Sequence, residues 1–123
     1  RTSYTTFLLT ASGRMYSSVN KLYRAEVIKK HHLAFEEDVN FAEDTRFVLN
    51  YIKAAGGQIS FVLKPLYKYN FGTEGSTIKK TGTDWKNWEK LYAFLKKWDK
   101  NIWTDLVLFR WRVSYLRTVA RSK

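Results

Sequence analysis

Residues 40–57 read NFAEDTRFVLNYIKAAGG and form the clearest structural element of the chain. Asn40 is of a type that favours the N-cap of a helix, and Glu43 three residues later completes a capping-box pattern. Apolar or aromatic side chains recur at helical spacing at Phe41, Val48, Tyr51, Ile52 and Ala55. Gly56 and the glycine after it end the pattern, because glycine readily adopts the left-handed conformation of the C′ position. The sequence therefore predicts a helix over residues 41–55.

Two adjacent carboxylates, Glu43 and Asp44, stand at the start of this helix and point in different directions. At about 100° per residue, Asp44 falls inside the apolar stripe and Glu43 falls outside it. Glu43 has a structural role as a capping residue at the positive end of the helix. An aspartate that faces inward needs a hydrogen bond, an ion pair or an opening to a cleft, so Asp44 is a candidate general base. The alternative is that Asp44 pairs with a nearby Lys or Arg, or caps the first turn.

The rest of the chain consists of shorter elements. A short helix follows residues 20–24 and runs to about His31. Residues 58–63 alternate apolar and polar side chains, as in a strand with one apolar face, and residues 66–70 form a second short strand after Pro65. A glycine-containing loop follows over residues 71–84. Helical periodicity resumes at Trp85, either as two helices or as one helix broken near residues 99–101.

Two short strands make a poor sheet on their own. We therefore expect them to complete a sheet whose other strands lie outside this chain, or to pair between molecules in an oligomer. The predicted fold class is α/β, an α+β fragment in which helices pack on a small incomplete sheet. Amphipathic C-terminal helices follow this part.

The composition is strongly basic, with 22 Lys and Arg against 11 Asp and Glu, a net charge of +11. Such a surface attracts nucleic acid, anionic lipid or phosphate-bearing ligands without choosing among them. Acidic residues gather in residues 36–44, whereas Lys and Arg dominate from Lys96 onward. Cysteine is absent, which excludes disulfides and thiolate metal sites.

The sequence contains no apolar run approaching the roughly 20 residues of a membrane-spanning helix. Residues 1–10 lack the pattern of a signal peptide. The chain starts at Arg1 without an initiator methionine, and we expect a processed or excised fragment. We also expect a cytoplasmic location, with peripheral association at the inner face of the membrane as an open alternative.

Short motifs follow one another in a fixed order between residues 20 and 77: Lys21-Leu22-Tyr23-Arg24, Phe35-Glu36, Glu43-Asp44 with Phe47, Pro65-Leu66-Tyr67 with Tyr69, and Gly75-Ser76. This ordered set resembles the C-terminal half of family 2 glycosyltransferases, which are inverting enzymes of the GT-A fold. The resemblance covers about half of the chain, and its specificity lies in the order and spacing of the motifs. It implies that residues 1–80 are the acceptor-side C-terminal part of a GT-A domain. Residues 81–123 are then an aromatic and basic helical extension.

In that family, the aspartate of the Glu-Asp pair is the catalytic base. It removes the proton of the acceptor hydroxyl, which then attacks the anomeric carbon of a nucleotide-sugar with inversion. The resemblance therefore implies Asp44 as the base, the residue that the helix direction also selects. It implies contacts to the acceptor or to phosphate from Lys21, Arg24, Tyr67, Tyr69 and Ser76. For Lys21 and Arg24, a solvated basic face is an equal alternative.

The chain also departs from the family pattern. No Asp-x-Asp motif and no nucleotide-binding βαβ region precede Glu43, so we expect the chain to be inactive alone. The resemblance implies a divalent metal, Mg or Mn, held in the full enzyme by ligands outside this chain. Its partners are a nucleotide-sugar donor and a saccharide or lipid-linked acceptor.

Two family signatures differ further. Asn70 replaces a basic residue that often meets phosphate, and Lys79 and Lys80 are candidate substitutes. Val107 replaces the glutamine of the Gln-x-x-Arg-Trp signature of processive synthases, so a non-processive transferase is favoured.

Other interpretations compete with the transferase. The pair His31-His32 suggests a metal site, but a surface helix end is favoured because the pair lacks a third ligand at useful spacing. Interleaved Trp and basic residues suggest nucleic-acid binding, but Trp85, Trp88 and Trp98 fall on one helical stripe typical of packing. We therefore do not expect nucleic acid as a partner. An anionic membrane surface is a candidate partner of residues 85–123, and a basic aromatic binding module without catalysis is the alternative function.

Overall fold

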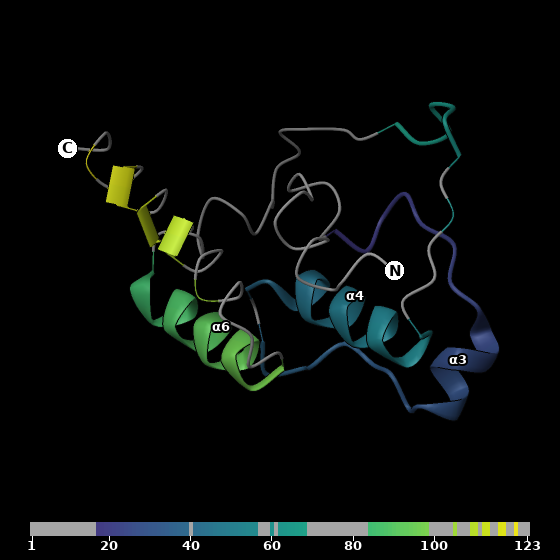
Figure 1. Ribbon diagram of the computed structural model, residues 1–123, viewed down its shortest axis with the longest axis horizontal. Helices are drawn as coiled ribbons and strands as arrows, with labels where there is room; N and C mark the ends of the chain where they lie inside the picture. Colours follow the sequence, from purple (N-terminus) through teal and green to yellow (C-terminus); the bar gives the residue numbers. More distant parts are fainter. Residues whose placement is uncertain are drawn as a thin grey trace. The chain divides into compact units, whose positions relative to one another are not determined.

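The computed structural model describes residues 17–39, 41–56, 60, 62–68 and 84–98, together with residues 105, 109, 110, 112, 113, 116, 117 and 120. The chain divides into two compact units. One unit is Ser12–Thr77, and the other combines Arg1–Ala11 with Ile78–Lys123. The first unit contains α3 (Ala25–Lys30) and α4 (Glu43–Ala54), and the second contains α6 (Trp85–Trp98) (Figure 1).

Helix α3 ends in a Schellman motif. The N–H of His32 donates to the carbonyl of Lys29 at 3.3 Å, and the N–H of Leu33 donates to the carbonyl of Ile28 at 3.0 Å. His32 adopts a left-handed conformation with φ of 50°, the conformation that this motif requires at C′. His31 is the C-cap. The prediction that the two histidines stand at a surface helix end is confirmed.

The predicted start of α4 is wrong by two residues. The helix begins at Glu43, and its N-cap is Ala42, which has φ of 58° and ψ of 25°. A left-handed residue does not continue a right-handed helix, so the regular hydrogen bonds start only after it, with Arg46 N–H donating to Ala42 O at 3.0 Å. Glu43 is therefore the first helical residue and not the third residue of a capping box. Its remaining structural role is the favourable charge in the first turn.

The end of α4 matches the prediction. Ala55 is the C-cap, and Gly56 follows at C′ with φ of 73°. The Gly56 N–H donates to Lys53 O at 3.3 Å, which satisfies one of the last carbonyls of the helix. Glycine stands here because a left-handed backbone costs it no steric strain.

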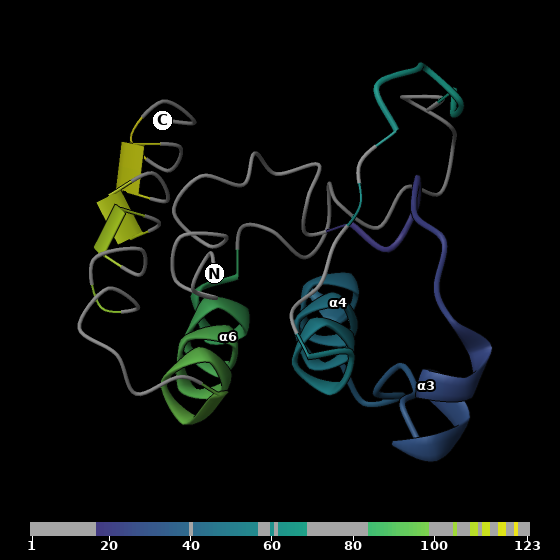
Figure 2. The same ribbon diagram turned by 45° about the vertical axis from the view of Figure 1, so that its right-hand side comes forward.

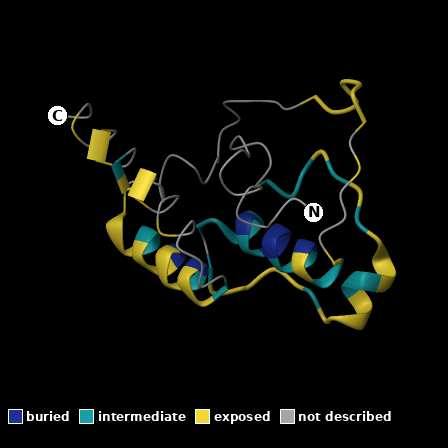
Figure 3. Ribbon diagram, viewed as in Figure 1, coloured by how far each residue is buried: buried dark blue, intermediate teal, exposed yellow. Residues whose placement is uncertain are grey.

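The buried face of α4 is broader than the predicted stripe. Its buried residues are Thr45, Phe47, Val48, Leu49 and Ile52, drawn in dark blue in Figure 3. Val48 and Ile52 confirm the predicted stripe. Phe47 and Leu49 extend the buried arc on both sides of Val48, and Phe41 precedes the helix. Helix α3 contacts α4 near the C-terminal end of α4 (Figures 1 and 2).

The predicted strands do not appear in the part of the chain that the structure describes. Residue 60 and residues 62–68 lie outside any strand, and all of them are exposed. The exposed side chains include Val62, Leu63 and Leu66, which the alternating pattern assigned to strands. The physical reason is that strands need a neighbouring strand for their backbone hydrogen bonds. The described residues therefore support a helical fold and give no support to the α/β class.

Helix α6 begins where the sequence predicts. Asp84 caps it, since its Oδ1 accepts the N–H of Lys86 at 2.9 Å. Its buried residues are Leu91 and Leu95, whereas Trp85 and Tyr92, assigned to the packing stripe, are exposed. The buried face is therefore rotated from the predicted stripe toward Leu91. Within the described residues, no helix is long and apolar enough to cross a membrane.

Candidate functional site

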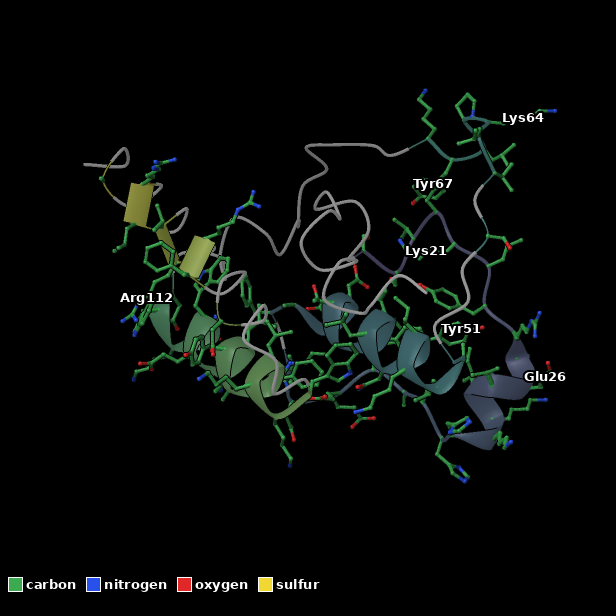
Figure 4. The ribbon with its side chains drawn as sticks, viewed as in Figure 1. Lys21, Glu26, Tyr51, Lys64, Tyr67 and Arg112 are labelled. Carbon is green, nitrogen blue, oxygen red and sulfur yellow. The ribbon has the colours of Figure 1, made fainter. Side chains whose placement is uncertain are left out.

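The irregular segment 17–24 lies along α4 and follows the direction of the helix. At one end, the Ser17 hydroxyl donates to Asp44 Oδ2 at 3.4 Å. At the other end, the backbone N–H of Arg24 donates to the Tyr51 hydroxyl at 2.7 Å. Figure 4 labels Lys21 on this segment and Tyr51 on α4. Two hydrogen bonds thus join the segment to the first and third turns of the helix.

The segment must bend to make both contacts. Seven residues of extended chain span roughly 23 Å, whereas the seven residues from Asp44 to Tyr51 rise only about 10 Å along a helix. The excess length is taken up by bends over residues 17–20. Asn20 adopts a left-handed conformation with φ of 59°, which asparagine tolerates better than most residues.

Two side chains from the same segment brace this bend. The Lys21 Nζ donates to the carbonyl of Ser17 at 2.5 Å and to that of Val19 at 3.4 Å. The Tyr23 hydroxyl donates to the carbonyl of Ser18 at 3.0 Å. Because both donors act on Ser17 or the two residues after it, they hold Ser17 in position against Asp44.

The charges of this cluster influence one another. Partial burial lowers the pKa of Lys21, and the nearby Asp44 carboxylate opposes part of that decrease. The pKa of Tyr23 is raised to about 12, first by burial and then by electrostatic interactions with Asp44 and Tyr51. We call Ser17, Lys21, Tyr23, Asp44 and Tyr51 the Asp44 cluster.

Aromatic packing fixes the helix beneath the cluster. The Tyr23 ring meets the edges of Phe47 and Tyr51, with ring centroids 5.4 Å and 4.8 Å apart. Phe35 stacks on Phe47 with a centroid distance of 4.5 Å. Such pairs add about 0.5–1.5 kcal/mol each beyond the burial of their area. The orientation of α4 relative to segment 17–24 is thus held by rings and not only by polar contacts.

An ion pair holds the loop before α4. Arg46 Nη1 lies 2.6 Å from Glu36 Oε2. This contact pairs Arg46 with a carboxylate of the loop and not with Asp44. The acidic residues of 36–44 therefore separate into a structural partner, Glu36, and the cluster residue Asp44.

The arrangement suits Asp44 to accept a proton from a hydroxyl. Asp44 is the second residue of α4, where the positive end of the helix dipole favours a carboxylate. It is half-buried and already accepts one hydroxyl, that of Ser17. The 3.4 Å distance exceeds the roughly 2.5–3.0 Å of a strong O–H···O bond, so this contact is weak. A second hydroxyl that approaches the carboxylate competes with a weak bond only.

The structure brings together some of the residues selected from sequence and separates others. Asp44 and Lys21 lie in the cluster, and Arg24 joins it through its backbone while its side chain is exposed. Lys21 is half-buried and braces a bend, so it is not part of a solvated basic face. Tyr67 lies on the exposed segment 62–68, with Lys64 (Figure 4). Tyr69 and Ser76 lie outside the described residues.

Sequence reasoning missed Ser17 as a partner of Asp44. The two residues are 27 positions apart, and Ser17 belongs to no periodic pattern. The only sequence signal was indirect, since Lys21 and Tyr23 in the Lys-Leu-Tyr-Arg motif hold the bend that carries Ser17. Tyr51 was placed on the helix stripe, but its role as an acceptor for Arg24 requires the tertiary structure.

Within the described ranges, no group of three or more His, Cys, Asp or Glu side chains is arranged to hold a metal ion. The Asp44 cluster contains one carboxylate, that of Asp44. Comparisons of the chain with models of protein families, with curated protein sequences and with solved structures found no match.

Proposed function

We propose that this chain is the acceptor-side, catalytic-base-bearing part of a non-processive inverting glycosyltransferase. The reaction transfers a sugar from a nucleotide-sugar to a saccharide or lipid-linked acceptor. Asp44 takes the proton of the acceptor hydroxyl while that oxygen attacks the anomeric carbon. The nucleotide leaves from the opposite face, and the configuration at the anomeric carbon is inverted.

The observation that carries the proposal is the contact between Asp44 and a hydroxyl group. The carboxylate stands at the start of α4, half-buried, with the Ser17 hydroxyl directed at its Oδ2. A general base must lie within hydrogen-bond reach of the proton that it removes. The contact with the Ser17 hydroxyl supports this assignment, because an alcohol oxygen of the chain lies 3.4 Å from Asp44 Oδ2. The resemblance of the motifs from residues 20 to 77 to family 2 glycosyltransferases selects the same residue.

The proposal also assigns a role to the exposed apolar segment. Under this proposal, residues 58–63 and 66–70 belong to an incomplete sheet whose other strands lie in the nucleotide-sugar-binding part of the enzyme. Val62, Leu63 and Leu66 are then covered when the two parts fold together. The metal of the complete enzyme, Mg or Mn, is held by that same part and not by the Asp44 cluster.

The test is a substitution of Asp44 in the protein encoded by the complete gene. Asp44→Asn keeps the size of the side chain and removes the base, so transfer falls by about 10²- to 10⁴-fold. The measurement is incorporation of radiolabelled sugar from a panel of nucleotide-sugars into an extract of cell membranes and polysaccharide. Binding of the nucleotide-sugar stays within a few-fold of the wild-type value, because the acceptor side does not hold the donor.

The neighbouring carboxylate provides the matched comparison. Glu43→Gln removes the same charge from the same helical turn, yet only the helix dipole is affected, which is worth about 0.3–1 kcal/mol. Its transfer rate therefore falls far less than that of Asp44→Asn. Equal rates for Asp44→Asn and the wild type would exclude Asp44 as the base. A gene without an Asp-x-Asp region before the codon for Arg1 would contradict the transferase assignment as a whole.

A further inference from the structure

The C-terminal region exposes an apolar helical face. All described residues between Asp105 and Ala120 have helical conformation. Phe109 and Leu116 are 65% and 58% exposed. Residues seven apart lie on the same side of a helix, so these two side chains share one face. In most globular proteins such a face turns toward the core, whereas these two side chains lie on the surface.

Arginines border this face on both sides. With Phe109 and Leu116 at the centre, Arg112 lies about 50° to one side, and Arg110 and Arg117 lie about 100° to the other, at 100° per residue. All three arginines are exposed. The Arg112 guanidinium also lies 5.4 Å from the ring centroid of Trp85, at the start of α6. Figure 4 labels Arg112 beside that helix.

We propose that this face, made of Phe109, Leu116 and the flanking Arg110, Arg112 and Arg117, binds the surface of an anionic lipid bilayer. The apolar centre enters the boundary between headgroups and acyl chains. The arginines extend to the lipid phosphates on either side of it, because their long stems allow the charge to remain at the polar level. The excess of positive charge over the chain attracts it to such a surface.

The apolar centre favours a bilayer over nucleic acid. A phosphate backbone attracts arginines, but it offers no apolar layer to cover an exposed phenylalanine and leucine. A bilayer satisfies both parts of the face at once. The inference is independent of the proposed transferase activity, since it concerns residues outside the Asp44 cluster and its test requires no catalysis.

The experiment is co-sedimentation of the chain with vesicles, either of phosphatidylcholine alone or of phosphatidylcholine mixed with phosphatidylglycerol. We expect binding to the anionic vesicles, weaker binding to the neutral ones, and a decrease at high salt. The variant R110Q/R112Q/R117Q binds anionic vesicles on the order of a hundredfold more weakly, about fivefold for each arginine. The variant F109S/L116S loses at least about tenfold through the apolar contact.

The matched control is K29Q/K30Q/K64Q, which removes three positive charges from exposed lysines elsewhere in the chain. We expect it to bind within a few-fold of the wild type. Circular dichroism tests whether each variant keeps its helical content, which is expected because every substituted side chain is exposed or half-exposed.

Two results would overturn the inference. Equal losses in the arginine and lysine variants would show a diffuse charge effect and no defined face. Unchanged vesicle binding by F109S/L116S, with loss of both vesicle and duplex DNA binding by the arginine variant, would make the face a polyanion site and exclude the lipid assignment.

Discussion

Helix α4 and segment 62–68 both contain several apolar side chains, yet only α4 buries them. Leu49 on α4 is 0% exposed, whereas Leu63 on the segment is 96% exposed. Figure 3 shows the difference as dark blue against yellow. A helix satisfies its backbone hydrogen bonds within itself and then needs only a surface for one face. A strand needs a second strand before its side chains have a face to bury.

An apolar pattern predicts that a segment needs a packing partner. It does not predict where that partner lies. For α4, the partners include aromatic residues of the same unit, Tyr23 and Phe35. For segment 62–68, the described residues contain no strand that pairs with it. Under the proposed function, that partner belongs to the donor-binding part of the enzyme.

Among these predictions, substitution of Leu49 is expected to change the stability of the chain most. Leu49→Ala removes a fully buried side chain and leaves a cavity, which costs about 3 kcal/mol of unfolding free energy. Leu63→Ala removes the same atoms from an exposed position and costs less than about 0.5 kcal/mol. Urea denaturation followed by circular dichroism measures both. Similar losses for the two variants would mean that segment 62–68 is packed, and the comparison would fail.

The same pair of variants also tests the proposed function. Under that proposal, a sheet of the complete enzyme covers segment 62–68. Leu63→Ala then destabilises it by about 2 kcal/mol or more, as expected for a buried leucine. A cost that stays below about 0.5 kcal/mol in the complete protein would exclude this segment from the sheet.

The sequence predicts some helix boundaries better than others, and the reasons are physical. The helices of α4 and α6 were predictable because their periodicity and the glycine at position 56 are local signals. The start of α4 was not, because the residue type of Ala42 does not indicate the left-handed conformation that it adopts. Alanine in that conformation costs about 1–2 kcal/mol, which the Phe35–Phe47 stack and the Glu36–Arg46 pair help to offset.

The candidate site was predictable only in part. The direction of Asp44 on the helix identified it as a carboxylate that requires a partner. Ser17, the partner in the structure, lies 27 residues away on an irregular segment with a left-handed Asn20. No local pattern encodes a contact over that distance, because it depends on how segment 17–24 bends along α4.

A smaller effect is expected at the end of α4. Gly56 has φ of 73°, and a Cβ added there meets no atom within 4 Å. Gly56→Ala therefore introduces no clash and costs only the strain of a left-handed alanine, about 1 kcal/mol.

The matched substitution is His32→Gly, at the left-handed C′ position of α3. It relieves strain and stabilises the chain by up to about 1 kcal/mol. Thermal unfolding of both variants measures the two opposite shifts. A neutral result for Gly56→Ala would show that α4 frays before Gly56, which would weaken its contrast with segment 62–68.

The smallest effect at neutral pH is expected at Tyr23, which packs against Phe47 and Tyr51 of α4 and whose contribution to stability falls as pH rises. Tyr23→Phe keeps the ring contacts and loses the hydrogen bond to Ser18 O, at a cost of about 0.5 kcal/mol.

The pKa of Tyr23 is raised to about 12 in the folded chain, because burial and Asp44 disfavour the phenolate. Between about pH 10 and 12, unfolded chains lose this proton and folded chains keep it, so the wild type loses stability as pH rises. The advantage of the wild type over Tyr23→Phe in urea denaturation therefore shrinks from pH 8 to pH 11. The lowered pKa of Lys21 gives the opposite slope in both proteins and cancels in their difference. A difference that stays constant over this range would mean that the Tyr23 hydroxyl is solvated and does not brace the bend at Ser18.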